Sequence, residues 1–217
     1  MNKSNKKKKY TQRFTLIEAL VAIAILLIAV VEPLSLTANS VKNANFAKDQ
    51  ITSFYLAQEG IEFVRNKRDT NVLNGLTGTN WLSGLENCLH DNGPDNEPLT
   101  DDDSDASFNK WCTFDVANDI NNPATFKDCS DGVNIKPACT TDDFIFRLIP
   151  VGVGNALRYG LSTDESYQRS TFRRFLQVYE VIPGREASIV TFVGRTGGSG
   201  PVFTIRERIF NWIGYED

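Results

Sequence analysis

The chain has 217 residues, enough for one ordinary domain with an appended segment and too few for two well-buried cores. With 41% apolar and 23% charged residues, its composition is that of a globular chain and not of a disordered or fibrous one. The net charge of −4 is uneven, because residues 1–13 carry six basic side chains and no acid, which leaves 17 basic against 27 acidic residues elsewhere. Nucleic-acid binding requires cations that displace phosphate counterions, so the acidic body argues against a nucleic-acid partner.

An apolar segment follows the basic residues directly. Residues 14–31 read FTLIEALVAIAILLIAVV, in which Glu18 is the only charge. As a helix these residues span roughly 27 Å, which is enough to cross the hydrocarbon core of a bilayer. The positive-inside rule then places residues 1–13 in the cytoplasm and the chain after Val31 outside. We therefore expect a single pass through the cytoplasmic membrane, with the N-terminus inside.

The helical pattern continues beyond this segment. Pro33 has no amide hydrogen, so a kink is expected there. After a short polar stretch, apolar residues recur with helical spacing, at Ala47, Ile51, Phe54, Ala57, Ile61 and Val64. Leu56 and Phe63 form a smaller strip that is expected on the opposite side, where it indicates either a further neighbour or a larger head. We expect a membrane-spanning helix over 14–36 and an amphipathic helix over 37–69, whose end coincides with Lys67, Arg68 and Asp69.

The four cysteines all follow the apolar segment and indicate disulfides. They are Cys88, Cys112, Cys129 and Cys139. No CxxC pair is present and His90 is the only histidine, so a zinc site of ordinary spacing is not expected, and His90 is interpreted as a surface loop residue. An even number of cysteines outside the cytoplasm favours two disulfides. Three connectivities are open, and we favour Cys88–Cys112 with Cys129–Cys139 because local closure is the simplest pairing.

The rest of the chain predicts a globular head over residues 70–217. Residues 70–142 are rich in Asn, Asp, Gly and Thr, which favours loops and short strands held by the disulfides. From residue 143 onward the segments are rich in β-branched and aromatic residues, and turn signals at 183–184 and 196–200 separate the last three. We expect a C-terminal antiparallel meander that packs on the amphipathic part of the helix. The predicted fold class is α+β.

The head offers no strong candidate for a catalytic or metal site. Residues 91–105 are strongly acidic, and Asp101, Asp103 and Asp105 could supply oxygen ligands to calcium. The spacing of an EF-hand loop is missing, so a solvated acidic loop is favoured. No arrangement of a nucleophile with a histidine is visible. We therefore expect no enzymatic activity and no cofactor.

The N-terminal motif resembles that of the type IV pilins and their pseudopilin relatives. A basic leader precedes Arg13-Phe14-Thr15-Leu16-Ile17-Glu18 and an apolar run, and residues 57–69 (AQEGIEFVRNKRD) are similar to the helix end of some minor pilins. The resemblance implies a pilin-like fold, cleavage between Arg13 and Phe14 by a prepilin peptidase, and N-methylation of Phe14. Arg13 stands where the family has glycine. Glu18 occupies the position of the family's acidic residue.

The resemblance implies a structural role. The chain would be a filament subunit, minor rather than major, of a type IV pilus or a type II secretion-like machine, stored in the membrane and assembled with other pilin subunits through Glu18 and the kinked helix at Pro33. Two other classes stay open: a signal-anchored extracellular binding protein, and a secreted one cut after Ala38-Asn39-Ser40. The sequence leaves the machine and the ligand of the head open.

Overall fold

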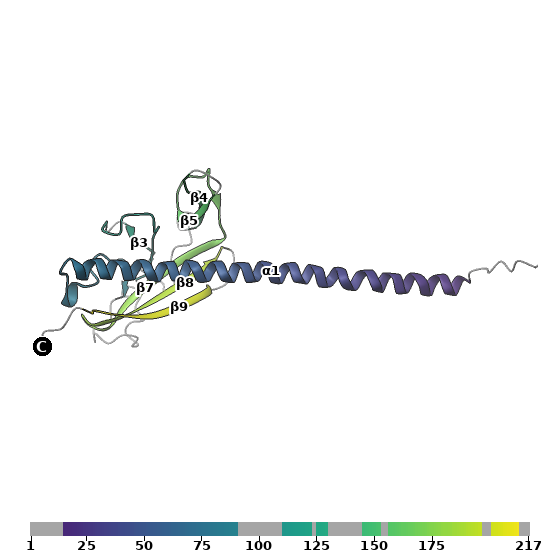
Figure 1. Ribbon diagram of the computed structural model, residues 1–217, viewed down its shortest axis with the longest axis horizontal. Helices are drawn as coiled ribbons and strands as arrows, with labels where there is room; N and C mark the ends of the chain where they lie inside the picture. Colours follow the sequence, from purple (N-terminus) through teal and green to yellow (C-terminus); the bar gives the residue numbers. More distant parts are fainter. Residues whose placement is uncertain are drawn as a thin grey trace, which may run out of the picture. The chain divides into compact units, whose positions relative to one another are not determined.

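The structure is a computed structural model, and it describes residues 15–90, 110–122, 125–129, 145–152, 156–196 and 201–212. The chain divides into two compact units, Met1–Lys48 and Asp49–Asp217. Helix α1 (Leu16–Leu73) contributes to both units, and all of the strands belong to the second. Within the described residues the second unit has an α+β layout, in which α1 packs against largely antiparallel sheets (Figure 1). This layout confirms the predicted fold class.

The end of α1 lies four residues beyond the predicted one, at Leu73 and not at Asp69. The amide of Leu76 donates to the carbonyl of Asn71 at 2.9 Å and the amide of Gly75 to that of Val72 at 3.0 Å. With Gly75 at φ 80°, these two bonds form a Schellman motif, which pairs the last carbonyls of a helix. The side chain of Asn71 also donates to the carbonyls of Trp81 and Ser83. The extra turn is therefore stabilised by the Schellman motif and by the side chain of Asn71. The basic residues at 67–68, which suggested the earlier end, gave no sign of these contacts.

The main sheet is built around a three-stranded antiparallel meander, β7-β8-β9. The strands are β7 (Phe172–Ile182), β8 (Glu186–Arg195) and β9 (Pro201–Phe210). Pro183 and Gly184 join the first two in a tight turn, with the amide of Arg185 on the carbonyl of Ile182 and Gly184 at φ 71°. Proline followed by a residue with positive φ is the pattern of a type II turn. The predicted meander is confirmed between residues 172 and 210, apart from 197–200, which lie outside the described residues.

Short strands extend this sheet along the other edge of β7. They are β1 (Leu89–His90), β2 (Cys112–Thr113) and β3 (Lys127–Asp128), in the order β3-β2-β7-β8-β9 with β1 also on β7. The β1–β7 pair is parallel, unlike the others. A separate sheet has the order β5-β4-β6, with β4 (Phe146–Pro150), β5 (Leu157–Leu161) and β6 (Gln168–Arg169). One 3-10 turn, Gly78–Asn80, follows α1. In the described parts of residues 74–142, the predicted loops thus contain elements of only two or three residues.

The face of α1 that meets the sheet differs from the predicted stripe. Ala57, Ile61 and Val64 are buried as expected, but Ile51 is 58% exposed and Phe54 is 42% exposed. Leu56 and Phe63, which were placed on the opposite side, are buried with the main stripe. The head wraps a face wide enough to cover both strips. The second strip therefore needs no further neighbour, which resolves the alternative in favour of the larger head.

The position of His90 was also predicted wrongly. It lies at the end of β1, it is buried, and its Nδ1 is 3.2 Å from Nε2 of Gln177 on β7. A loop histidine is usually exposed, but here the pairing of β1 with β7 brings it over the sheet. The polar residues that follow His90, from Asp91 onward, favoured a loop and concealed this position.

Candidate functional site

The first half of α1 presents an apolar surface without cover from the chain. Every residue from Leu16 to Lys48 is exposed, including nearly all the large aliphatic side chains of the predicted membrane segment. By length and composition alone, α1 is the one helix among the described residues that could cross a membrane. An apolar surface of this size requires lipid or other protein around it.

Glu18 lies in the first turn of α1, and its amide donates to the hydroxyl of Thr15 at 3.3 Å. Thr-x-x-Glu is the pattern of a capping box, in which the threonine satisfies a free amide at the helix N-terminus. A carboxylate there also interacts favourably with the positive end of the helix dipole. The sequence carries this pattern at residues 15–18. Glu18 therefore has a local role that needs no partner.

Pro33 lies inside α1, which continues on both sides of it. The hydroxyl of Thr37 donates to the carbonyl of Pro33 at 2.8 Å, and that of Ser40 to the carbonyl of Leu36 at 2.9 Å. Serine and threonine inside a helix commonly donate in this way to the carbonyl four residues earlier. The polar residues after Pro33 thus pair with the helix itself, and the helix does not end there.

A buried arginine joins the second half of α1 to the sheet. Arg174 of β7 is 1% exposed, and its guanidinium donates to the carbonyl of Leu56 and the carboxylate of Glu59, both at 2.9 Å. It also donates to the carbonyl of Phe114 at 3.1 Å and lies 4.4 Å from the centre of that ring. Burial lowers the pKa of Arg174, and the Glu59 carboxylate opposes this shift. The sequence showed Arg174 only as one of two arginines in a strand, so its role was missed.

Gly60 allows this arginine to lie against α1. A Cβ at residue 60 would be 3.0 Å from Cδ of Arg174 and 3.3 Å from Cγ2 of Thr191. Glycine inside a helix costs about 1 kcal/mol relative to alanine. The close approach of helix and sheet explains why this position has no side chain.

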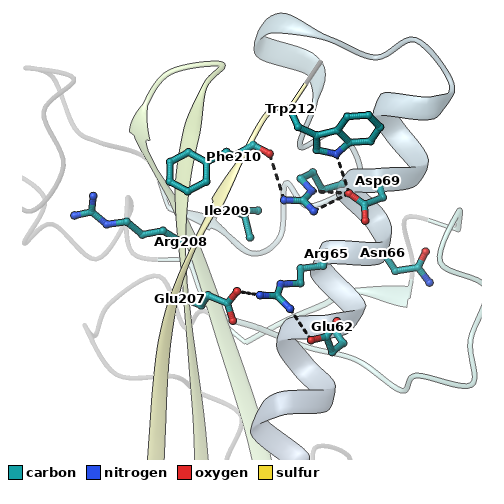
Figure 2. Close-up of a pocket in the computed structure, with 10 residues that line it drawn as sticks. Glu62, Arg65, Asn66, Asp69, Glu207, Arg208, Ile209, Phe210 and Trp212 are labelled. Atoms are coloured by element: carbon teal, nitrogen blue, oxygen red, sulfur yellow. Dashed lines mark hydrogen bonds and ion pairs between the residues drawn. The ribbon is translucent and has the colours of Figure 1, made fainter. Parts of the chain in front are cut away.

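A groove between α1 and β9 is lined by charged side chains from both elements (Figure 2). Arg65 extends from the helix to pair with Glu207 on β9, and it also pairs with Glu62. Arg68 donates to the carbonyl of Phe210 at 3.2 Å, and Trp212 donates to Asp69. These charges satisfy one another, and the side chains from α1 cover part of an edge strand that could otherwise pair with another chain. The ion pair and the hydrogen bond across this groove therefore hold β9 against α1.

The cysteine positions are resolved in part. A disulfide joins Cys88 to Cys112, one of the two pairs that the sequence favours. Cys129 is disulfide-bonded as well, while Cys139 lies outside the described residues. Asp101, Asp103 and Asp105, the candidate calcium ligands, also lie outside them, as do Arg13 and Phe14. Among the residues that the structure describes, no group of three His, Cys, Asp or Glu side chains could hold a metal ion.

Comparison with known proteins adds no relative: no protein-family model, no curated protein and no solved structure matches the chain.

Proposed function

We propose that the chain is a structural subunit, minor rather than major, of a type IV pilus or a type II secretion-like filament. One observation carries the proposal: a single helix is exposed and apolar in its first half and packed on a disulfide-bonded head in its second. The resemblance of residues 13–18 to the pilin motif names the class of filament. The partners are other pilin subunits and a prepilin peptidase, and no nucleic acid is expected.

The subunit is stored in the cytoplasmic membrane with residues 1–13 inside and becomes extracellular on assembly. Lipid covers the apolar half of α1 before assembly. In the filament the same half of other subunits replaces the lipid, so the apolar side chains need never meet water. Insertion and assembly then use one surface at different times.

Glu18 is proposed to set the register between subunits. Cleavage before Phe14 creates an α-amine at the helix N-terminus, and that cation can pair with the Glu18 carboxylate of a neighbour. Because a buried charge without a partner costs several kcal/mol, subunits that are offset along the axis are penalised. The ion pair fixes the axial position of neighbouring subunits more than it adds to the stability of the filament.

The test separates the charge of Glu18 from its capping role. Glu18→Gln keeps the capping pattern, since glutamine also fits it, and removes the charge. We expect normal membrane insertion and head folding, with about tenfold less subunit in sheared filaments than the parent. Glu32→Gln, the other exposed acid of this half, is the matched control and should assemble normally. Equal assembly of Glu18→Gln and the parent would contradict the pairing.

A signal-anchored extracellular binding protein is the second candidate. The place of Glu18 in the first turn of α1 favours it, because a carboxylate there interacts favourably with the helix dipole without a partner subunit. Mass spectrometry of the mature N-terminus separates the classes. A chain that begins at Phe14 supports the pilin, an intact leader supports the anchor, and a start at Val41 supports the secreted form. Arg13→Gly should accelerate cleavage, since Arg13 replaces the family's glycine.

A further inference from the structure

One edge of β7 is paired by two short pieces of chain that lie end to end. Cys112 of β2 is opposite Leu176, and Leu89 of β1 is opposite Val178. The amide of Val178 donates to the carbonyl of Cys88 at 2.8 Å, which brings Cys88 to the same edge. Each strand has two residues, far fewer than an independently stable pairing requires. Something other than backbone pairing must hold them.

The Cys88–Cys112 disulfide joins these two pieces directly. The cysteines are 24 residues apart in sequence, and both side chains are fully buried at the edge of β7. Closing a loop of this length in the unfolded chain is worth on the order of a hundredfold in the folding equilibrium. The disulfide thus holds β1 and β2 together beside β7, and the two form one composite edge strand.

This composite strand positions the partner of the helix. Two residues after Cys112, Phe114 stacks on Phe63 of α1 with ring centres 4.5 Å apart. Its ring and its carbonyl both contact the guanidinium of Arg174, which in turn donates to the carbonyl of Leu56 on α1. Phe114 is therefore fully buried between the helix and the sheet. Only Thr113 separates Cys112, which the disulfide holds, from Phe114, which contacts α1.

We propose that oxidation of Cys88 and Cys112 gates the docking of α1 on the head. Closing the bond removes two protons and two electrons from the two thiols, and a disulfide oxidant accepts both and is reduced to two thiols. Such oxidants act outside the cytoplasm. The location of this oxidation step rests on the proposed export of the head. With that export, α1 is held on the head only after the head has crossed the membrane.

The experiment compares hydrogen exchange in variants of the full chain in detergent micelles. One variant carries Cys88→Ala with Cys112→Ala. Val178→Ala, a buried change on the same edge that keeps the disulfide, is the control for lost volume. Phe114→Leu keeps the disulfide and removes the ring that contacts Arg174. Amides of residues 57–64 report the helix, and amides of β8 provide the internal reference, because β8 pairs along its length with β7 and β9 and contains neither cysteine.

We expect the double cysteine variant to lose clearly more protection at 57–64 than in β8, because the helix then opens locally from a loosened edge, in addition to any global loss of stability that both elements share. Phe114→Leu should lose part of the same protection, and Val178→Ala should lose protection evenly in helix and sheet. Uniform loss in both elements of the cysteine variant would overturn the gate, as would no loss in either. Full protection of the helix in Phe114→Leu would overturn the path through that ring. These results do not depend on filament entry, so the failure of the gate and that of the proposed function are distinguishable.

Discussion

The two halves of α1 have the same backbone structure and opposite environments. Ile25 in the first half is 62% exposed, whereas Ile61 in the second is 2% exposed. Both are isoleucines within one continuous helix, and both lie in segments rich in apolar residues. The helix itself therefore does not decide where an apolar side chain is covered. The head covers one half, and the other half requires lipid or another protein.

The same comparison separates two kinds of contact. In the second half, apolar burial is combined with a buried arginine, two carbonyls and a carboxylate, so the helix has a single position on the sheet. Between Leu16 and Ala47 the described residues make no such directional contact, apart from bonds within the helix itself. A surface of this kind can exchange one apolar environment for another, which is what storage in a membrane followed by assembly requires.

The largest expected effect comes from matched isoleucine changes in the two halves. Ile61→Ala should destabilise the head by about 3 to 4 kcal/mol, because the cavity adds to the lost burial. Ile25→Ala should change the unfolding of the head by less than about 0.5 kcal/mol, since the head does not cover it. Denaturant unfolding of the full chain in micelles, followed by tryptophan fluorescence to which the buried Trp81 contributes, measures both. Similar losses for the two variants would break the comparison.

The next effect concerns the directional contact. Arg174→Ala should cost about 3 kcal/mol, since it leaves two buried carbonyls without a donor and Glu59 without a partner; the partial exposure of Glu59 keeps the cost from being higher. Arg206→Ala is the matched control: Arg206 is exposed on β9, its guanidinium lies 5.9 Å from the ring centre of Tyr179, and its loss should cost less than about 1 kcal/mol. The same unfolding measurement applies. A cost for Arg174→Ala no larger than that of the control would show that apolar burial alone holds the helix.

A smaller effect tests how closely helix and sheet approach. Gly60→Ala should destabilise the head by about 1 kcal/mol, because the methyl group meets Arg174 and Thr191 and this overpacking exceeds the gain in helix propensity. In the Arg174→Ala background the destabilisation should be smaller, because the contact with Arg174 is gone and Thr191 is the remaining close neighbour. A double-mutant cycle of unfolding free energies measures the coupling. Additive effects would contradict the contact.

The smallest effect appears in alkali. Partial burial and the nearby Asp49 carboxylate raise the pKa of Tyr159 above its ordinary value of 10.0, against a hydrogen bond from Thr52 that lowers it. The folded state therefore keeps the phenol proton at a pH where the unfolded state has lost it. This contribution is complete below pH 10.0 and is lost as the pH rises through the folded pKa. Tyr159→Phe should make the stability fall less steeply above pH 10.0 than in the parent, as measured by denaturant midpoints; identical slopes would contradict the shift.

The sequence by itself determined the features that depend on local pattern. The apolar run of 14–31, the α+β layout and the meander joined at Pro183-Gly184 are each set by composition, period and turn residues over short stretches. The favoured pairing of Cys88 with Cys112 needed no more than their proximity in the chain. Such features follow from neighbours along the chain, because those neighbours limit the backbone directly.

Only the tertiary structure decided which side of α1 is covered and what holds it there. Helical spacing located the apolar residues of α1 but could not show that Leu56 is buried and Ile51 is exposed. The main sheet that covers Leu56 lies more than a hundred residues further along the chain. The burial of Arg174 could not be predicted for the same reason: its carbonyl partners come from residues 56 and 114. Burial of a charge is determined by the groups that compensate it, and those groups are brought together only by the fold.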